Sequence, residues 1–212
     1  MTSDLIVRFL TVGIFAENSY VLGAAGAGVL VDPGGEVPGL LATAERLGLE
    51  IEAIWLTHAH IDHLLGVGEA VERTGVDVAL HEDDRFLYDG AAEQGRAFGL
   101  ELAPLPAPGI ALHDGARLSL GGLEVQVLHV PGHSPGHVAF WIPAARALVS
   151  GDVLFAGSIG RTDLPGGAYD TLIASIRRRI LPLGDDVRVY AGHGPPTSVG
   201  VERRTNPFLT GG

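Results

Sequence analysis

The first half of the chain alternates short apolar runs with longer amphipathic stretches. Short runs rich in β-branched residues predict strands, and stretches whose apolar positions recur every 3.6 residues before a glycine predict helices. Strands are expected at Leu5–Thr11, Ser19–Gly23, Gly28–Asp32, Ile51–Thr57 and Val76–Leu80. Helices are expected at Val37–Leu47 before Gly48, at Leu64–Arg73 before Gly75, and at Glu82–Phe98 with breaks at Gly90 and Gly95.

The second half shows the same alternation after a proline-rich segment. Residues 103–109 contain three prolines, which remove backbone donors and keep the chain extended, so this segment is expected to join two halves of one domain. A helix is expected at Tyr169–Ile180, because its apolar residues share one face. Strands are expected at Arg117–Leu120, Leu123–His129, Val138–Ile142, Ala147–Ser150 and Val187–Ala191.

This alternation of strands and helices indicates an α/β fold in which sheets lie between layers of helices. A length of 212 residues suits one domain, since single hydrophobic cores divide only beyond about 250–300 residues. Residues 1–212 are therefore expected to form a single domain with two βα halves.

The composition is typical of a soluble globular protein. Hydrophobic residues make up 46% of the chain and charged residues 18%, and no run approaches the roughly 20 apolar residues that a membrane helix needs. Residues 1–10 lack the basic start and small-residue cleavage site of a signal peptide. A cytoplasmic location is therefore expected.

Cysteine content and net charge exclude several kinds of chemistry. The chain has no cysteine, so disulfides are impossible and any metal must be held by histidine and carboxylate side chains. The formal net charge of −11 opposes binding to nucleic acid or to an anionic membrane surface. A nuclease is therefore disfavoured, and neither a nucleic-acid nor a membrane partner is expected.

Four potential metal ligands occur within six residues: His58, His60, Asp62 and His63. They directly follow the apolar strand expected at Ile51–Thr57 and precede a helix. Residues at the carboxyl end of a strand converge on the space beyond the sheet, and alternate residues of extended chain point the same way. Because desolvated Asp and His side chains need partners, this cluster predicts a metal site.

Three further candidates occupy the same kind of position after later strands. They are His133, Asp152 and His193. Each is preceded by glycine, which permits a tight turn and a close approach of the backbone to a site. The recurrence of strand, glycine and ligand is the strongest pattern in the chain, and it places these side chains with the first cluster.

At these residues the chain resembles the metallo-β-lactamase superfamily, whose HxHxDH motif is complete from His58 to His63. Within the superfamily it is similar to the short, glyoxalase II-like (hydroxyacylglutathione hydrolase-like) branch. The resemblance continues through GHSPGH (132–137), SGD (150–152), GRTD (160–163) and GHG (192–194), so it covers nearly the whole chain. It implies an αββα sandwich of two mixed β-sheets flanked by helices.

The resemblance also implies roles for the seven ligands. One divalent metal ion would have three imidazole ligands: His58, His60 and His133. A second ion would have ligands of mixed charge: Asp62, His63 and His193. Asp152 would bridge the two ions, and Asp62 would also orient the attacking hydroxide, so Asp62 and Asp152 are the expected catalytic residues. Zinc is the expected metal, although these ligand types also accept iron or manganese.

Arg161 lies in a glycine-rich loop where the resemblance implies substrate contacts. The alternative role for its guanidinium group is a local salt bridge with Asp163. His137 is a candidate to hydrogen-bond a metal ligand, because it follows His133 closely. The remaining histidines each stand alone near a strand or turn and are expected to be ordinary packing or surface residues: His81, His113 and His129.

The leading functional hypothesis is a dinuclear metallohydrolase of acyl thioesters such as S-lactoylglutathione. Longer glyoxalase II enzymes carry a C-terminal helical extension with glutathione-binding residues, which this chain is expected to lack. The alternative with the same motif is a persulfide dioxygenase, whose single iron would use His58, His133 and Asp152. A β-lactamase is disfavoured, because zinc β-lactamases commonly have cysteine at the position of Asp152.

Overall fold

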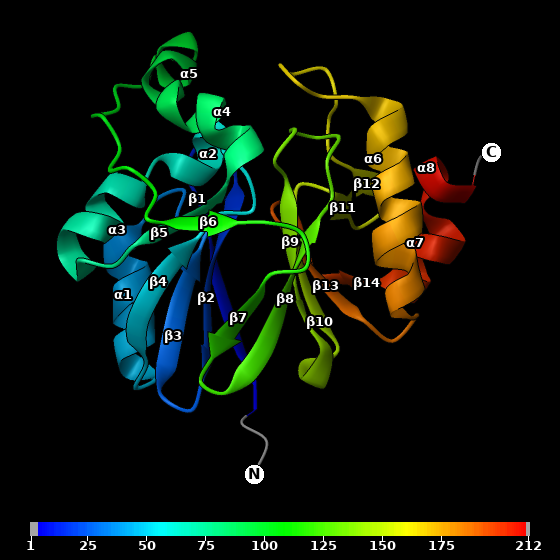
Figure 1. The fold of residues 1–212 in the computed structure, drawn as a ribbon, viewed down its shortest axis with the longest axis horizontal. Helices are drawn as coiled ribbons and strands as arrows, with labels where there is room; N and C mark the ends of the chain where they lie inside the picture. The colour runs from blue at the N-terminus through cyan, green and yellow to red at the C-terminus, as the bar shows by residue number, and fades with distance from the viewer. Residues whose placement is uncertain (1–3, 211–212) are drawn as a thin grey trace.

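The computed structural model describes residues 4–210. Two mixed β-sheets face each other and helices cover the outer face of each sheet, so the expected αββα sandwich is confirmed (Figure 1). Within residues 4–210, no helix is long and apolar enough to cross a membrane.

The first sheet contains six strands in their order along the chain. The first two pairs are antiparallel, and the other three pairs are parallel because longer crossovers connect their strands. The strands are β1 (Ile6–Val12), β2 (Glu17–Ala24), β3 (Ala27–Val31), β4 (Glu50–Trp55), β5 (Val78–His81) and β6 (Ile110–Leu112).

Glycine stop signals predict the ends of two helices correctly. α1 (Val37–Arg46) ends shortly before Gly48 and α3 (Val67–Thr74) directly before Gly75. Both glycines have the positive φ that other residues avoid. The start of the second helix differs from the prediction, because α2 (Ile61–Leu64) forms a separate turn before it.

The segment expected as a broken helix consists of three short pieces. These are η1 (Glu82–Asp84), α4 (Arg85–Asp89) and α5 (Ala91–Ala97). The break at Gly90 is confirmed, but the expected break at Gly95 is wrong, because Gly95 lies inside α5. A side chain at Gly95 would be crowded, since an added Cβ would lie 3.1 Å from the Leu100 carbonyl oxygen.

The second sheet also has six strands, in the order β14-β13-β10-β9-β8-β7. The proline-rich segment 103–109 leads into β6, so the chain passes to this sheet a few residues later than expected. The strands are β7 (Arg117–Leu120), β8 (Leu123–His129), β9 (Val138–Ile142), β10 (Ala147–Gly151), β13 (Arg188–Ala191) and β14 (Thr197–Ser198). A separate hairpin contains β11 (Leu154–Phe155) and β12 (Ser158–Ile159).

The helix expected at residues 169–180 is present, with a change of helix type near its middle. It begins as α6 (Tyr169–Ser175) and continues as the π-helical turn η3 (Ile176–Ile180). Its apolar face is buried against the second sheet, as the spacing predicts. The sequence pattern did not predict the remaining short elements: η2 (Pro143–Ala145), η4 (Leu181–Leu183), α7 (Val199–Thr205) and α8 (Pro207–Thr210).

The two halves share one hydrophobic layer between the sheets. Trp55 of β4 packs against Phe140 of β9, with ring centroids 5.2 Å apart. Two further hydrophobic clusters are present: one lies between the first sheet and its helices, and the other lies between the second sheet and its helices. Strands buried on both faces give the loops that follow them fixed starting points, which positions the side chains described next.

Candidate metal centre

The seven predicted ligands come together in space, from loops and short elements that follow four different strands. His58 and His60 follow β4, and Asp62 and His63 lie in α2. The other three follow β8, β10 and β13: His133, Asp152 and His193. Within each of two groups the potential ligand atoms lie within 4.8 Å of one another: His58, His60 and His133, and Asp62, His63, Asp152 and His193.

We call His58, His60 and His133 the three-histidine cluster. His133 Nδ1 lies 2.7 Å from the Arg161 carbonyl oxygen, which only accepts, so Nδ1 carries the proton. The Thr57 hydroxyl donates to a carboxylate and therefore accepts from His58 Nδ1, 3.0 Å away. The unprotonated Nε2 atoms of His58 and His133 consequently face each other at 3.2 Å, an arrangement that a cation between them stabilises.

Two imidazoles of this cluster, those of His58 and His60, are uncharged at neutral pH. Burial, followed by the neighbouring His63 imidazole, lowers the pKa of His58 well below its ordinary value. Burial, followed by the His133 imidazole, lowers the pKa of His60 to about 3. Neutral imidazole is the form that binds a metal ion, so His58 and His60 need no proton release before binding.

We call Asp62, His63, Asp152 and His193 the mixed cluster. His193 Nε2 lies 3.2 Å from Asp62 Oδ2 and 3.4 Å from Asp152 Oδ2, and His63 Nε2 lies 3.5 Å from Asp152 Oδ1. Burial would lower the pKa of His63, but the carboxylates of Asp62 and Asp152 outweigh it and raise that pKa well above its ordinary value. The pKa of His193 rises to about 10, because hydrogen bonds to Asp152 and Asp62 outweigh the effect of burial.

Asp152 lies between the two clusters. Its Oδ2 is 3.6 Å from His133 Nε2 of the three-histidine cluster and 3.4 Å from His193 Nε2 of the mixed cluster. Burial would raise the pKa of Asp152, but the imidazole of His63 and the hydrogen bond from His193 hold it well below its ordinary value. The glycine at position 192 is required here, because an added Cβ would overlap Asp152 Oδ1.

Three atoms of the mixed cluster are buried without a hydrogen-bond partner among the described residues. One is His63 Nδ1, which lies 3.0 Å from Asp32 Oδ2, and the other two face each other: His63 Nε2 and Asp152 Oδ1. Buried polar atoms nearly always have a partner, so each such exception needs an explanation. His63 Nε2 and Asp152 Oδ1 face the interior of the cluster, and imidazole and carboxylate are ligands that zinc, iron and manganese accept. The residues present therefore fit divalent metal ions.

Asp32 supports the centre from the end of β3. Its Oδ1 accepts from the Thr57 amide (2.7 Å), and its Oδ2 accepts from the Thr57 hydroxyl (2.6 Å) and lies 3.0 Å from His63 Nδ1. A carboxylate on the outer nitrogen of a histidine fixes the ring and increases its basicity as a ligand. The sequence analysis overlooked Asp32, although it follows a strand as the other ligands do.

Asp84 supports the centre from η1 and is fully buried. Its carboxylate accepts from the Ala59 amide (3.1 Å), the Ser134 hydroxyl (2.7 Å) and the Gly136 amide (2.6 Å). It thereby joins the loop that carries His58 and His60 to the loop that carries His133. No sequence signal distinguished Asp84 from the two acidic residues before it.

His137 hydrogen-bonds a predicted ligand, as the sequence analysis suggested. Its Nε2 accepts from the Asp152 amide at 3.0 Å, and its ring stacks on His58 with centroids 4.7 Å apart. The sequence analysis expected two other histidines, His81 and His129, to stand alone, and this expectation is wrong. His81 and His129 stack on each other from the ends of β5 and β8, with centroids 4.3 Å apart and ring planes 10° apart.

A pocket of about 610 Å³ opens beside both clusters. Arg161 is one of its lining residues, and the Arg161 guanidinium also donates to both carboxylate oxygens of Asp163, at 2.7 Å each. The salt bridge that the sequence analysis offered as an alternative is therefore present. The contact of Arg161 with substrate stays a prediction.

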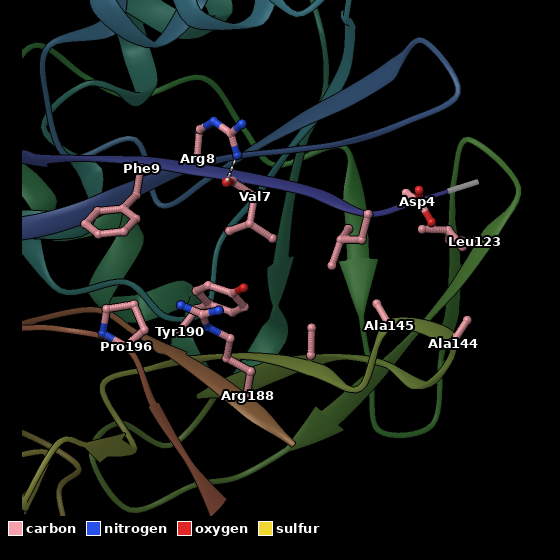
Figure 2. A pocket seen from close by; sticks show the side chains of 12 residues that line it. Asp4, Val7, Arg8, Phe9, Leu123, Ala144, Ala145, Arg188, Tyr190 and Pro196 are labelled. Carbon is pink, nitrogen blue, oxygen red and sulfur yellow. Dashed lines mark hydrogen bonds between the residues drawn. The ribbon is translucent and has the colours of Figure 1, made fainter. Parts of the chain in front are cut away.

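A second cavity, of about 680 Å³, lies along β1 and contains none of the seven predicted ligands. Figure 2 shows its side chains, which include two arginines and a tyrosine. Arg188 lies over the Tyr190 ring, 5.5 Å from its centroid, and Arg8 donates to the carbonyl oxygen of Val7. Because several of the predicted ligands line the smaller pocket and none lines this cavity, the smaller pocket is the candidate site.

Comparison with known proteins agrees with this geometry. The family model of the metallo-beta-lactamase superfamily matches residues 12–193. The hydroxyacylglutathione hydrolase GloC of Haemophilus influenzae is 39% identical over 206 residues, which are 96% of this chain and 97% of that protein.

Two solved structures share the fold over nearly the whole chain. The BLEG-1 B3 metallo-beta-lactamase superposes with a TM-score of 0.90 at 38% identity, covering 97% of this chain and 100% of that one. TTHA1623 in a di-iron-bound form superposes with a TM-score of 0.88 at 47% identity, covering 96% and 100%. With the family model spanning most of its length, the chain belongs to the metallo-β-lactamase superfamily.

Proposed function

We propose that this protein is a dinuclear metallohydrolase that cleaves acyl thioesters such as S-lactoylglutathione. The observation that carries the proposal is the position of Asp152 Oδ2, which faces an imidazole nitrogen of each cluster at 3.4–3.6 Å. A carboxylate in that position can serve two metal ions at once. The similarity to a protein named hydroxyacylglutathione hydrolase supports the thioester as substrate.

Each ligand side chain has a defined part in this proposal. The three-histidine cluster would hold one ion, Asp62, His63 and His193 would hold the other, and Asp152 would serve both. When bound, two divalent ions supply a Lewis acid for the thioester carbonyl and lower the pKa of water toward neutrality. We propose zinc as the metal, and the di-iron form of TTHA1623 makes iron the first alternative to measure.

The protein's own groups prepare the reaction by orientation. The Arg161 carbonyl oxygen and the Thr57 hydroxyl fix the tautomers of His133 and His58. Asp62 has its pKa lowered, because the His63 imidazole and the hydrogen bond from His193 outweigh the effect of burial. Its carboxylate is therefore ionised at neutral pH and able to accept a hydrogen bond from the attacking water.

The test is the initial rate of S-lactoylglutathione hydrolysis by protein reconstituted separately with zinc, manganese and iron. We expect metal-dependent turnover that disappears in His58→Ala and in Asp152→Ala. A chromogenic β-lactam and glutathione persulfide with an oxygen electrode run as parallel substrates. Oxygen uptake with one iron per chain, or β-lactam hydrolysis without thioester hydrolysis, would overturn the proposal.

A further inference from the structure

The pocket beside the metal centre has a largely apolar wall. Its side chains include Phe15, Leu87, Phe98, Phe155 and Leu164. They come from distant parts of the chain: the loop between β1 and β2, α4, the end of α5, the β11 hairpin and the loop before α6. Such a wall contributes binding free energy only with an apolar partner, because the gain depends on removing apolar surface from water.

The polar side chains that line the pocket, apart from the predicted ligands, are Gln94 and Arg161. The Gln94 amide donates to the carbonyl oxygens of Ala59 (3.0 Å) and Leu87 (2.8 Å), so neither of its protons is available. The Arg161 guanidinium already forms its bidentate pair with Asp163. A charged substrate group in this pocket therefore has to compete with a protein partner.

An exposed aromatic side chain, Phe98, lines the pocket. Phe98 is 53% exposed and meets Phe15 edge to face, with ring centroids 5.0 Å apart. Ile14, beside Phe15 in sequence, is 74% exposed. Neighbouring exposed apolar side chains at a cavity are typical of a surface that binds an apolar ligand.

From these contacts we infer the substrate class within the proposed function: thioesters of an apolar acyl group with an uncharged thiol. This inference rests on the proposed thioester hydrolysis and narrows it. Glutathione carries two carboxylates at neutral pH, and the cation that lines the pocket, Arg161, already pairs with Asp163. Each methylene of an acyl chain that the wall removes from water increases binding about fourfold.

The experiment is a two-by-two panel of substrates with the metal-loaded protein. The acyl group is lactoyl or hexanoyl, and the thiol is glutathione or uncharged N-acetylcysteamine. We expect kcat/KM for S-hexanoyl-N-acetylcysteamine to exceed that for S-lactoylglutathione about tenfold or more. A preference for S-lactoylglutathione would overturn the inference and leave the proposed function intact, whereas no hydrolysis of any of the four would overturn both.

Variants of the wall test whether the structure is the cause of the preference. Phe98→Ala should reduce the ratio of kcat/KM for hexanoyl over lactoyl thioesters about threefold to tenfold, and Phe98→Leu should retain it. Phe208→Ala is the control, because Phe208 is a partly exposed phenylalanine of α8 that does not line the pocket. A ratio that Phe98→Ala leaves unchanged would contradict the inference.

Discussion

The three-histidine cluster and the mixed cluster are both largely buried, yet the pKa values of their histidines shift in opposite directions. Burial disfavours the charged form in each case, and in the three-histidine cluster it prevails and lowers the pKa values of His58 and His60. In the mixed cluster the two carboxylates outweigh burial and raise the pKa values of His63 and His193. The same residue type is therefore prepared as a neutral ligand in one cluster and as a charged partner in the other.

The comparison shows two ways of building a cation site from histidine. In the three-histidine cluster, His58 and His60 offer lone pairs that are already free of protons. The mixed cluster offers negative charge, and its imidazoles must lose protons when a cation binds. The following predictions concern the residue that joins the clusters, the protonation and the supports of the clusters, and one residue outside them.

The largest effect is expected from Asp152→Ala, because Asp152 faces both clusters. We expect thioester hydrolysis to fall about a thousandfold or more and the bound metal to fall by at least one equivalent. Initial rates and metal content by plasma mass spectrometry measure both. Asp185→Ala, a change at an exposed ion pair away from the centre, is the control. Full metal content in Asp152→Ala would contradict the bridging position.

Acidification should empty the mixed cluster first. Protons compete with the cation for His193 below its metal-free pKa of about 10, whereas they compete for His60 only below about 3. For one competing proton, affinity falls about tenfold per pH unit, so the affinity of the mixed cluster should fall steadily as pH is lowered from 9 to 6. Metal titrations across this range should show one pH-dependent and one nearly pH-independent site. Parallel loss of both ions would show that the clusters do not differ.

Asp32→Asn tests the support of the mixed cluster. The substitution keeps the shape of the side chain but removes the negative charge 3.0 Å from His63 Nδ1. We expect metal affinity at the mixed cluster to fall about 10- to 100-fold, with little change at the three-histidine cluster. A competition titration with a chromophoric chelator measures the two affinities. Equal losses at both sites would indicate that Asp32 acts through Thr57 instead.

Asp84→Asn tests the support of the three-histidine cluster. The asparagine amide would face the Gly136 N–H, which now donates to Asp84 Oδ1 at 2.6 Å, so one hydrogen bond is lost and two donors oppose each other. We expect the free energy of unfolding to fall by about 2 kcal/mol, measured by urea denaturation. Asp83→Asn is a matched control, since the Asp83 side chain is 58% exposed. Equal stability of the two variants would contradict the role assigned to Asp84.

The smallest effect is expected at Arg161, outside both clusters. Arg161→Ala should raise the KM for S-lactoylglutathione about threefold and leave that for an N-acetylcysteamine thioester unchanged, because Asp163 already shares the charge. The carbonyl oxygen that fixes His133 belongs to the backbone and is retained. Asp163→Ala should change the KM for S-lactoylglutathione in the opposite direction. Unchanged kinetics in Arg161→Ala would remove this residue from the substrate site.

Many strands and helices could be predicted from the sequence, because the spacing of hydrophobic residues within short segments indicates them. Period-2 and period-3.6 runs identify most of the long strands and helices, and Gly48 and Gly75 mark helix ends through a backbone conformation that suits glycine. The errors are short elements such as β6 and α7, and the Gly95 break inside α5. Short elements are held by tertiary contacts, so a window of sequence contains little of the energy that forms them.

The sequence by itself determined which residues meet at the metal centre, because each of the seven follows or begins an element whose position the hydrophobic pattern fixes. Only the tertiary structure decided which groups hydrogen-bond to these ligands and which protonation state each ligand has. The supports of the ligands, Asp32 and Asp84, reach residues about 25 or more positions away, and the opposite pKa shifts depend on which charges burial brings together. The apolar wall of Phe15 and Phe98 is likewise a contact between distant segments. Burial, distance and charge are properties of the folded chain, so no local pattern states them.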